Sequence, residues 1–159
     1  MNILEVVVMK KSATKVMASL FCVVLLFSCL TFQVSAQTVR DVEYFDDGSY
    51  VVTELTVNTD NPFARTGKSG SKTSTYYGSN NKAYFAVTLT GQFNYTYGSS
   101  AKATGASTSV TVYDSSASYV TKSATYSGAT ATGTGTVKVN ATSRTLTVKI
   151  TCDKYGNLS

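Results

Sequence analysis

A strict two-residue alternation from Ala83 to Tyr97 is the sequence feature that most constrains how this chain can fold. Apart from Gly91, every second residue in this segment is apolar or aromatic, and most residues between them are Thr, Gln or Asn. Successive side chains of a β-strand point to opposite faces of the sheet. The pattern therefore predicts one strand with a core face, which includes Phe85, Leu89 and Phe93, and a polar face.

This alternating segment is longer than an ordinary strand. Fully extended, residues 83–97 would measure about 50 Å, against roughly 17–20 Å for a common strand. We therefore expect a bulge or bend at Gly91, because glycine tolerates irregular strand geometry. With such a bend, the one strand would serve both sheets of a sandwich.

Shorter alternating segments predict the other strands of an all-β domain. Thr and Tyr are common in them, and no helical period is found after residue 36. Asp46-Asp47-Gly48-Ser49 and Gly78-Ser79-Asn80-Asn81 are predicted turns, and residues 58–69 and 98–106 are predicted loops. The expected fold is a sandwich of about eight antiparallel strands. Besides 83–97, the predicted strands are residues 40–45, 50–57, 72–77, 108–113, 118–126, 129–139 and 145–152.

The first 36 residues have the features of a cleaved secretory signal peptide. A basic segment with Lys10, Lys11 and Lys15 precedes an apolar run over residues 16–30, and Val34-Ser35-Ala36 has the small-x-small pattern of a cleavage site. We predict a signal peptide at 1–36, with Met9 as an alternative start of translation. The mature protein is then a single secreted domain at 37–159.

Cys29 offers an alternative to secretion. Leu26-Phe27-Ser28-Cys29 resembles the lipobox of bacterial lipoproteins, and an acylated Cys29 would anchor the protein to a membrane. Phe27, however, is bulky where such signals have a small residue. Residues 37–159 contain no further apolar stretch long enough to span a bilayer.

Composition restricts the chemistry of the mature protein. The sequence has no histidine, which excludes Ser-His-Asp and Cys-His nucleophile pairs and imidazole metal ligands. Loss of three lysines and one glutamate with the signal peptide lowers the net charge from +5 to +3, and the remaining basic residues are scattered. We therefore predict a protein that is not an enzyme, with no cofactor, no metal site and no nucleic-acid partner.

Cys152 is the one cysteine that remains after removal of the signal peptide, which contains Cys22 and Cys29. A disulfide within the mature monomer is therefore excluded. Cys152 shares its strand face with Val148 and Ile150, which predicts a free, buried thiol and a monomeric protein.

Four tyrosines are the candidate binding residues. They do not follow the core alternation, so some of them should be exposed: Tyr76, Tyr77, Tyr84 and Tyr113. Exposed tyrosines can stack on sugar rings or anchor a protein interface. They can equally form cross-strand pairs that stabilise the sheet.

Two stretches, YFAVTLTGQFNY at 84–95 and TCDKYGN at 151–157, resemble small uncharacterised secreted proteins of Gram-positive bacteria. The resemblance implies an immunoglobulin-like β-sandwich and no particular activity. It also implies a second cysteine near residues 98–107, where this sequence has none.

The function predicted from these features is binding, by an exported non-catalytic protein, to an extracellular protein or carbohydrate. A membrane-active or pore-forming protein is the first alternative, since residues 130–136 alternate small and hydroxyl side chains as membrane-inserting hairpins do. Its lipid-facing side would consist of Ala and Gly alone, which bury little apolar area. An enzyme without histidine chemistry is the second alternative.

Overall fold

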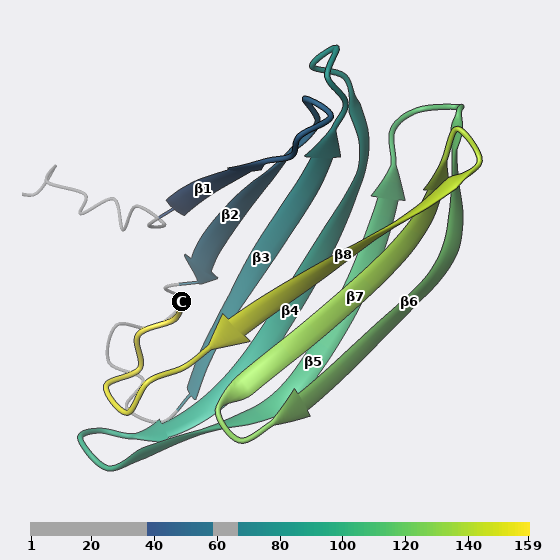
Figure 1. Cartoon of the computed structure of the whole chain (residues 1–159). Helices are drawn as coiled ribbons and strands as arrows, with labels where there is room; N and C mark the ends of the chain where they lie inside the picture. The colour runs from purple at the N-terminus through teal and green to yellow at the C-terminus, as the bar shows by residue number, and fades with distance from the viewer. Residues whose placement is uncertain (1–37, 59–66) are drawn as a thin grey trace, which may run out of the picture. The chain divides into compact units, whose positions relative to one another are not determined.

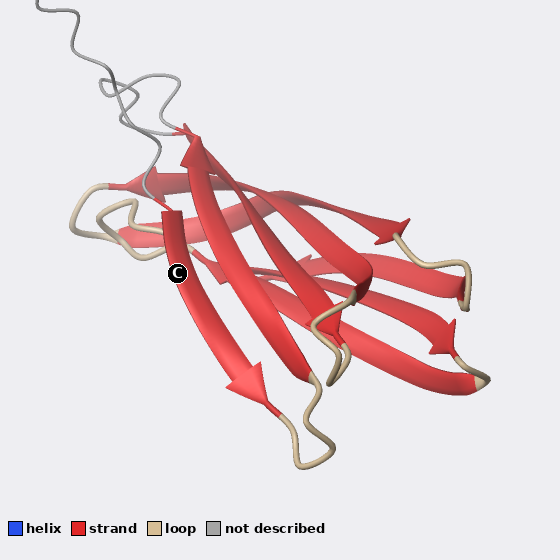
Figure 2. Cartoon of the chain, turned by 90° about the horizontal axis from the view of Figure 1, so that it is seen from above, coloured by secondary structure: helices blue, strands red, loops and turns tan. Residues whose placement is uncertain are grey.

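Eight antiparallel strands make up most of residues 38–58 and 67–159, which are the residues that this computed structural model describes (Figures 1 and 2). The chain divides into two units, Met1–Ser35 and Ala36–Ser159, and the described residues belong to the second. The predicted all-β class is confirmed. The strands are β1 (Thr38–Tyr44), β2 (Tyr50–Asn58), β3 (Gly67–Tyr77), β4 (Ala83–Thr96), β5 (Ser100–Val112), β6 (Ala117–Ser127), β7 (Thr130–Val139) and β8 (Thr142–Thr151).

The strands form two sheets in sequential order. One sheet has the order β1-β2-β3-β4-β5 and the other has the order β6-β7-β8, and the chain passes between them once, after β5. An immunoglobulin sandwich instead distributes its strands between sheets through Greek-key connections. The all-β sandwich class is therefore as expected, but the strand order is not that of an immunoglobulin domain.

The core lies between the two sheets. Phe85, Leu89 and Phe93 of β4 are at most 1 % exposed and face β7 and β8, as the alternation predicts. Because the second sheet has three strands, it lies over β3, β4 and β5, while Val51 and Leu55 of β2 are buried at the margin of the core and β1 is exposed. One side of the sandwich is therefore open (Figure 1).

Glycines in β7 allow the two sheets to approach closely. A Cβ atom at Gly135 would lie 2.6 Å from Val87 Cγ2 and 2.7 Å from Val110 Cγ2, and one at Gly133 would collide with the Thr108 hydroxyl. Ala131, on the same face, is fully buried. The small side chains of residues 130–136 therefore pack against the opposite sheet.

The predicted bend at Gly91 is wrong. Gly91 pairs in regular register with Gly70 on one side and Ala106 on the other, and β4 stays in the first sheet along its whole length. The irregularity lies after the next residue. Gln92 pairs with Gly105 and Phe93 pairs with Ala103, so one residue of β5 between these two partners is left unpaired. The extra residue therefore lies in β5, and β4 itself continues without a break.

The predicted loop at 98–106 is also wrong, since β5 begins at Ser100. Its many small residues carry no clear alternation, yet they pair with the long second half of β4. In the predicted loop 58–69, residues 67–69 belong to β3, and residues 59–66 lie outside the described part of the chain. Nowhere in that described part is there a helix of the length and apolarity that crossing a bilayer requires.

Candidate functional site

The four candidate tyrosines do not come together on one surface. Tyr76 is 6 % exposed and packs on Phe85, with 5.7 Å between ring centroids. Tyr84 is partly buried against the core, Tyr77 lies on the outer face of the first sheet, and Tyr113 is exposed just after β5. Tyr76 and Tyr84 lie 6.2 Å apart between ring centroids, but the four rings together form no shared binding platform.

Tyr77 belongs instead to a cross-strand row of three rings. It stacks on Tyr50 of β2 with centroids 4.8 Å apart, and Tyr50 lies 5.5 Å from Tyr44 of β1. Register brings these residues together, since Tyr44 pairs with Tyr50 and Tyr50 with Tyr77. Such pairs stabilise neighbouring strands.

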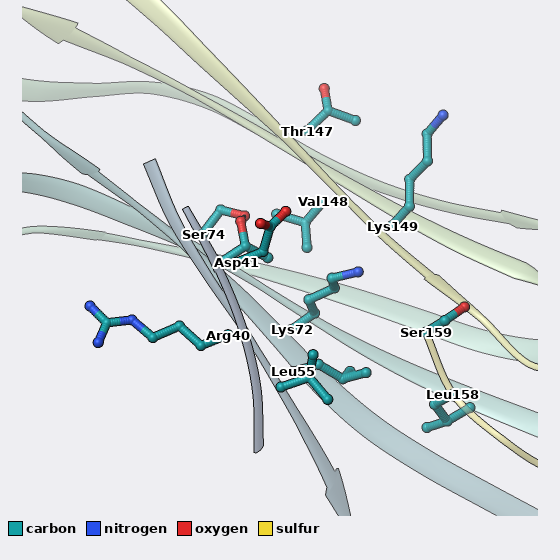
Figure 3. A pocket seen from close by; sticks show the side chains of 12 residues that line it. Arg40, Asp41, Leu55, Lys72, Ser74, Thr147, Val148, Lys149, Leu158 and Ser159 are labelled. Atoms are coloured by element: carbon teal, nitrogen blue, oxygen red, sulfur yellow. The ribbon is translucent and has the colours of Figure 1, made fainter. Parts of the chain in front are cut away.

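A groove lies on the open side of the sandwich. Its volume is about 690 Å³, and it lies between the inner face of β1, β2 and β3 on one side and the edge of β8 on the other (Figure 3). The chain segment after β8 closes one end of it with Leu158 and Ser159. The other lining residues are Val39, Arg40, Asp41, Thr53, Leu55, Lys72, Ser74, Thr147, Val148 and Lys149.

Strand register arranges the floor of the groove in two rows. Val39, Leu55 and Lys72 pair across β1, β2 and β3 and form the first row. Two residues further along each strand, Asp41 is in line with Thr53 and Ser74. The first row is therefore apolar on β1 and β2 and has the amine of Lys72 on β3. The second row is polar and has the carboxylate of Asp41 at the opposite end, on β1.

The charged groups of these two rows form no ion pair with a described residue. Lys72 is half-buried on the inner face of β3, and Asp41 is exposed on β1. The ion pairs found in the described chain join other residues: Arg40 with Glu54, Lys82 with Asp114, and Arg144 with Asp47. Since a half-buried charge is most stable beside an opposite charge, Lys72 is equipped to bind an anionic group.

The edge of β8 forms one wall of the groove and pairs with few residues in the part of the chain that the structure describes. β8 is the last strand of its sheet, and along its open edge Thr151 exchanges two backbone hydrogen bonds with Ser159, at 2.9 and 3.0 Å. Cys152 directs its N–H to the β7 side, where the Ala129 carbonyl accepts it. Backbone direction alternates along a strand, so Lys149, Thr147 and Thr145 present their N–H and C=O groups to the open edge.

A smaller cavity of about 270 Å³ lies where the β1–β2, β3–β4 and β7–β8 connections meet. Arg144 dominates it, with its guanidinium 3.1 Å from the Asp47 carboxylate and 5.6 Å from the centre of the Tyr76 ring. Hydrogen bonds from the Ser49 hydroxyl and backbone, together with Arg144, lower the pKa of Asp47. These groups satisfy one another, so the cavity is a structural junction between the three connections.

Hydroxyl side chains cover the outer face of β6, β7 and β8. Cross-strand hydrogen bonds join Ser123 to Thr134 at 2.6 Å and Thr136 to Thr145 at 2.8 Å. This face points away from the first sheet. Its positions on β7 therefore provide matched controls for experiments on the groove.

Cys152 lies in the core, away from both cavities, at 2 % exposure and with no disulfide. Burial raises the pKa of its thiol, and the Asp153 carboxylate raises it further. The neutral thiol is therefore favoured, which makes it a poor nucleophile. The described residues contain no cluster of three His, Cys, Asp or Glu side chains that could hold a metal ion.

Sequence reasoning did not identify the groove. Lys72 falls between small polar residues and showed no apolar alternation, so nothing marked it as facing inward. Comparison with known protein families, curated proteins and solved structures gives no match to this chain. The function is therefore argued from the geometry of the groove.

Proposed function

We propose that this protein is an exported, non-catalytic binding protein that recognises an extracellular protein through the groove between β1–β3 and β8. The leader at residues 1–36 supports export. The groove carries the binding proposal, since it combines four apolar lining residues, Val39, Leu55, Val148 and Leu158, with eight polar or charged ones. In such a site apolar area supplies affinity and polar groups supply specificity.

A protein partner fits the groove better than a sugar. The exposed Val39 side chain gives it apolar surface, and the tyrosines that could stack on a sugar ring are not among its lining residues. The groove is also bounded by an unpaired strand edge, which offers backbone hydrogen bonds to a polypeptide.

The pore-forming alternative loses its main motivation. The Ala and Gly side of residues 130–136 would have to face lipid, yet Ala131 is fully buried, and a Cβ added at Gly133 or Gly135 would collide with the opposite sheet. Close packing between sheets explains this small-residue pattern.

Binding of the fluorescently labelled mature protein to intact cells of the encoding organism tests the proposal. Val39→Arg and Lys72→Glu change the groove, and Thr134→Arg changes the outer face of β7 by a comparable amount. We expect binding that protease treatment of the cells removes, that both groove variants lose at least tenfold, and that Thr134→Arg retains. Binding that survives both groove variants, or that only glycosidases remove, would refute the proposal.

A further inference from the structure

We infer that the partner supplies an extended strand that pairs antiparallel with β8 and carries an acidic residue followed, two positions later, by a basic one. The inference rests on the proposed function and specifies the chemistry that the groove recognises. Pairing of a peptide with an exposed sheet edge is an established mode of recognition, in which backbone bonds supply affinity and alternate side chains supply specificity.

The protein itself contains the beginning of such a strand. Cys152 and Leu158 form an antiparallel bridge, and Ser159 bonds Thr151 through both backbone groups. The line that Leu158 and Ser159 occupy continues along the edge where Lys149 and Thr147 present free backbone groups. An incoming strand on this line would extend the sheet from three strands to four.

Leu158 shows where the inward side chains of that line go. Its Cδ1 lies so close to Gly70 that a Cβ there would be 2.6 Å from it. Side chains alternate along a strand, so an incoming strand points every second side chain into the groove, as Leu158 does, and the others outward, as Ser159 does.

The order of the inward side chains follows from the alignment of β8 over β3. At one end Leu158 lies on Gly70, and at the other the Arg144 guanidinium lies over the Tyr76 ring. A strand that runs antiparallel to β8 therefore passes first the row of Lys72 and then the row of Asp41 and Ser74. The carboxylate must come first along the partner, to meet Lys72, and the amine two residues later, to meet Asp41.

A second copy of this chain fits the edge less well through its own β8. The sequence of β8, TSRTLTVKIT, contains no acidic residue that could meet Lys72. A symmetric β8–β8 pairing would also need Thr151, whose edge Ser159 already occupies. The occupant that we infer is accordingly a segment of another protein and not β8 of a second copy.

Four synthetic peptides test the inference by fluorescence polarisation with the mature protein. TVTETKT places Val, Glu and Lys inward in the expected order, and TVTKTET has the same composition with the two charges exchanged. Two N-methylated forms of TVTETKT complete the set. One carries the methyl groups on the threonines that flank the glutamate, whose N–H groups face β8, and the other carries them on the valine and lysine, whose N–H groups face away.

We expect TVTETKT to bind at least tenfold more tightly than TVTKTET. Methylation of the threonines should abolish binding, and methylation of the valine and lysine should leave it within about threefold. Lys72→Glu should lose the preference for TVTETKT, while Lys138→Glu, an exposed change on the outer face of β7, should keep it. Amide hydrogen exchange at Thr145, Thr147 and Lys149 should slow when TVTETKT binds.

Equal affinity of the two charge orders, equal effects of the two methylation patterns, or no binding by any peptide would overturn the inference. A reversible dimer of the protein alone, observed by analytical ultracentrifugation and abolished by Lys72→Glu, would assign the groove to a second copy and also overturn it. If the peptides fail while cell binding still depends on Val39 and Lys72, the proposed function stands and only the strand inference falls.

Discussion

Asp114 illustrates at the scale of single residues how a nearly buried charge is retained in this fold. Its side chain is 8 % exposed and forms an ion pair with Lys82, which lies on the connection before β4. The Ser116 backbone N–H donates to it at 2.8 Å. The bond from Lys82, followed by those from Ser116, lowers the pKa of Asp114 to about 2. The ion pair thus links the β3–β4 connection to the β5–β6 connection, through which the chain passes from the first sheet to the second.

This lowered pKa predicts a stability change in acid. The ordinary pKa of 3.8 lies above the folded value of about 2, so the folded state gains stability above pH 4 and loses it as the pH falls from about 4 to 2. Asp114→Asn should lower the urea midpoint at neutral pH and flatten its decline below pH 4. Lys82→Met should have the same two effects, and a double variant should add little to either one. An unchanged acid slope in both variants would show that this pair does not contribute.

Cys152 provides a second prediction at the residue scale. Burial at 2 % exposure and a raised thiol pKa both slow its reaction, so maleimide should label the native mature protein only after denaturation. Non-reducing gels should accordingly show no covalent dimer. Rapid labelling of the native protein, measured by intact mass, would contradict the buried position.

At the scale of elements, alternation predicted strands well where one face is apolar and poorly elsewhere. β4 was recognisable because Phe85, Leu89 and Phe93 stand on one face between polar residues. The first half of β5 was not, since Ala101 and Ala103 give no contrast between its faces, although pairing with β4 buries them wholly or in part. Such a strand is specified by its neighbour, which a local pattern does not reveal.

The two faces of β4 predict unequal costs of substitution. Phe93→Ala should destabilise the protein by about 3–5 kcal/mol, because it leaves a cavity between the sheets, where Phe93 is 1 % exposed. Thr90→Ala removes a hydroxyl that lies 3.1 Å from the Ser71 hydroxyl on the outer face and should cost about 1 kcal/mol or less. Urea unfolding of both variants measures the difference. Similar losses would mean that the face assignment of β4 is wrong.

At the scale of the whole molecule, the groove results from the unequal widths of the two sheets. Five strands face three, so β1 remains exposed beside the edge of β8, and β2 contributes only Val51 and Leu55 to the margin of the core. The positions of the strands in the sequence do not predict how many strands each sheet has. No local pattern shows that the chain changes sheets after β5. For the same reason the partnership of Lys72 with Leu55, and of Thr151 with Ser159, was not predictable from the sequence.

The boundary of the mature protein is the last prediction. Cleavage after Ala36 would begin the chain at Gln37, and β1 begins at Thr38, so the cut would preserve every described strand and the groove residue Val39. Intact-mass analysis of protein recovered from the culture medium should therefore give the mass of residues 37–159. Acylation would instead retain the protein in the membrane fraction, with a diacylglyceryl group on Cys29 as its first residue. That mass would replace the secreted form with a lipoprotein, in which the segment from Cys29 to Gln37 would tether the groove to the membrane surface.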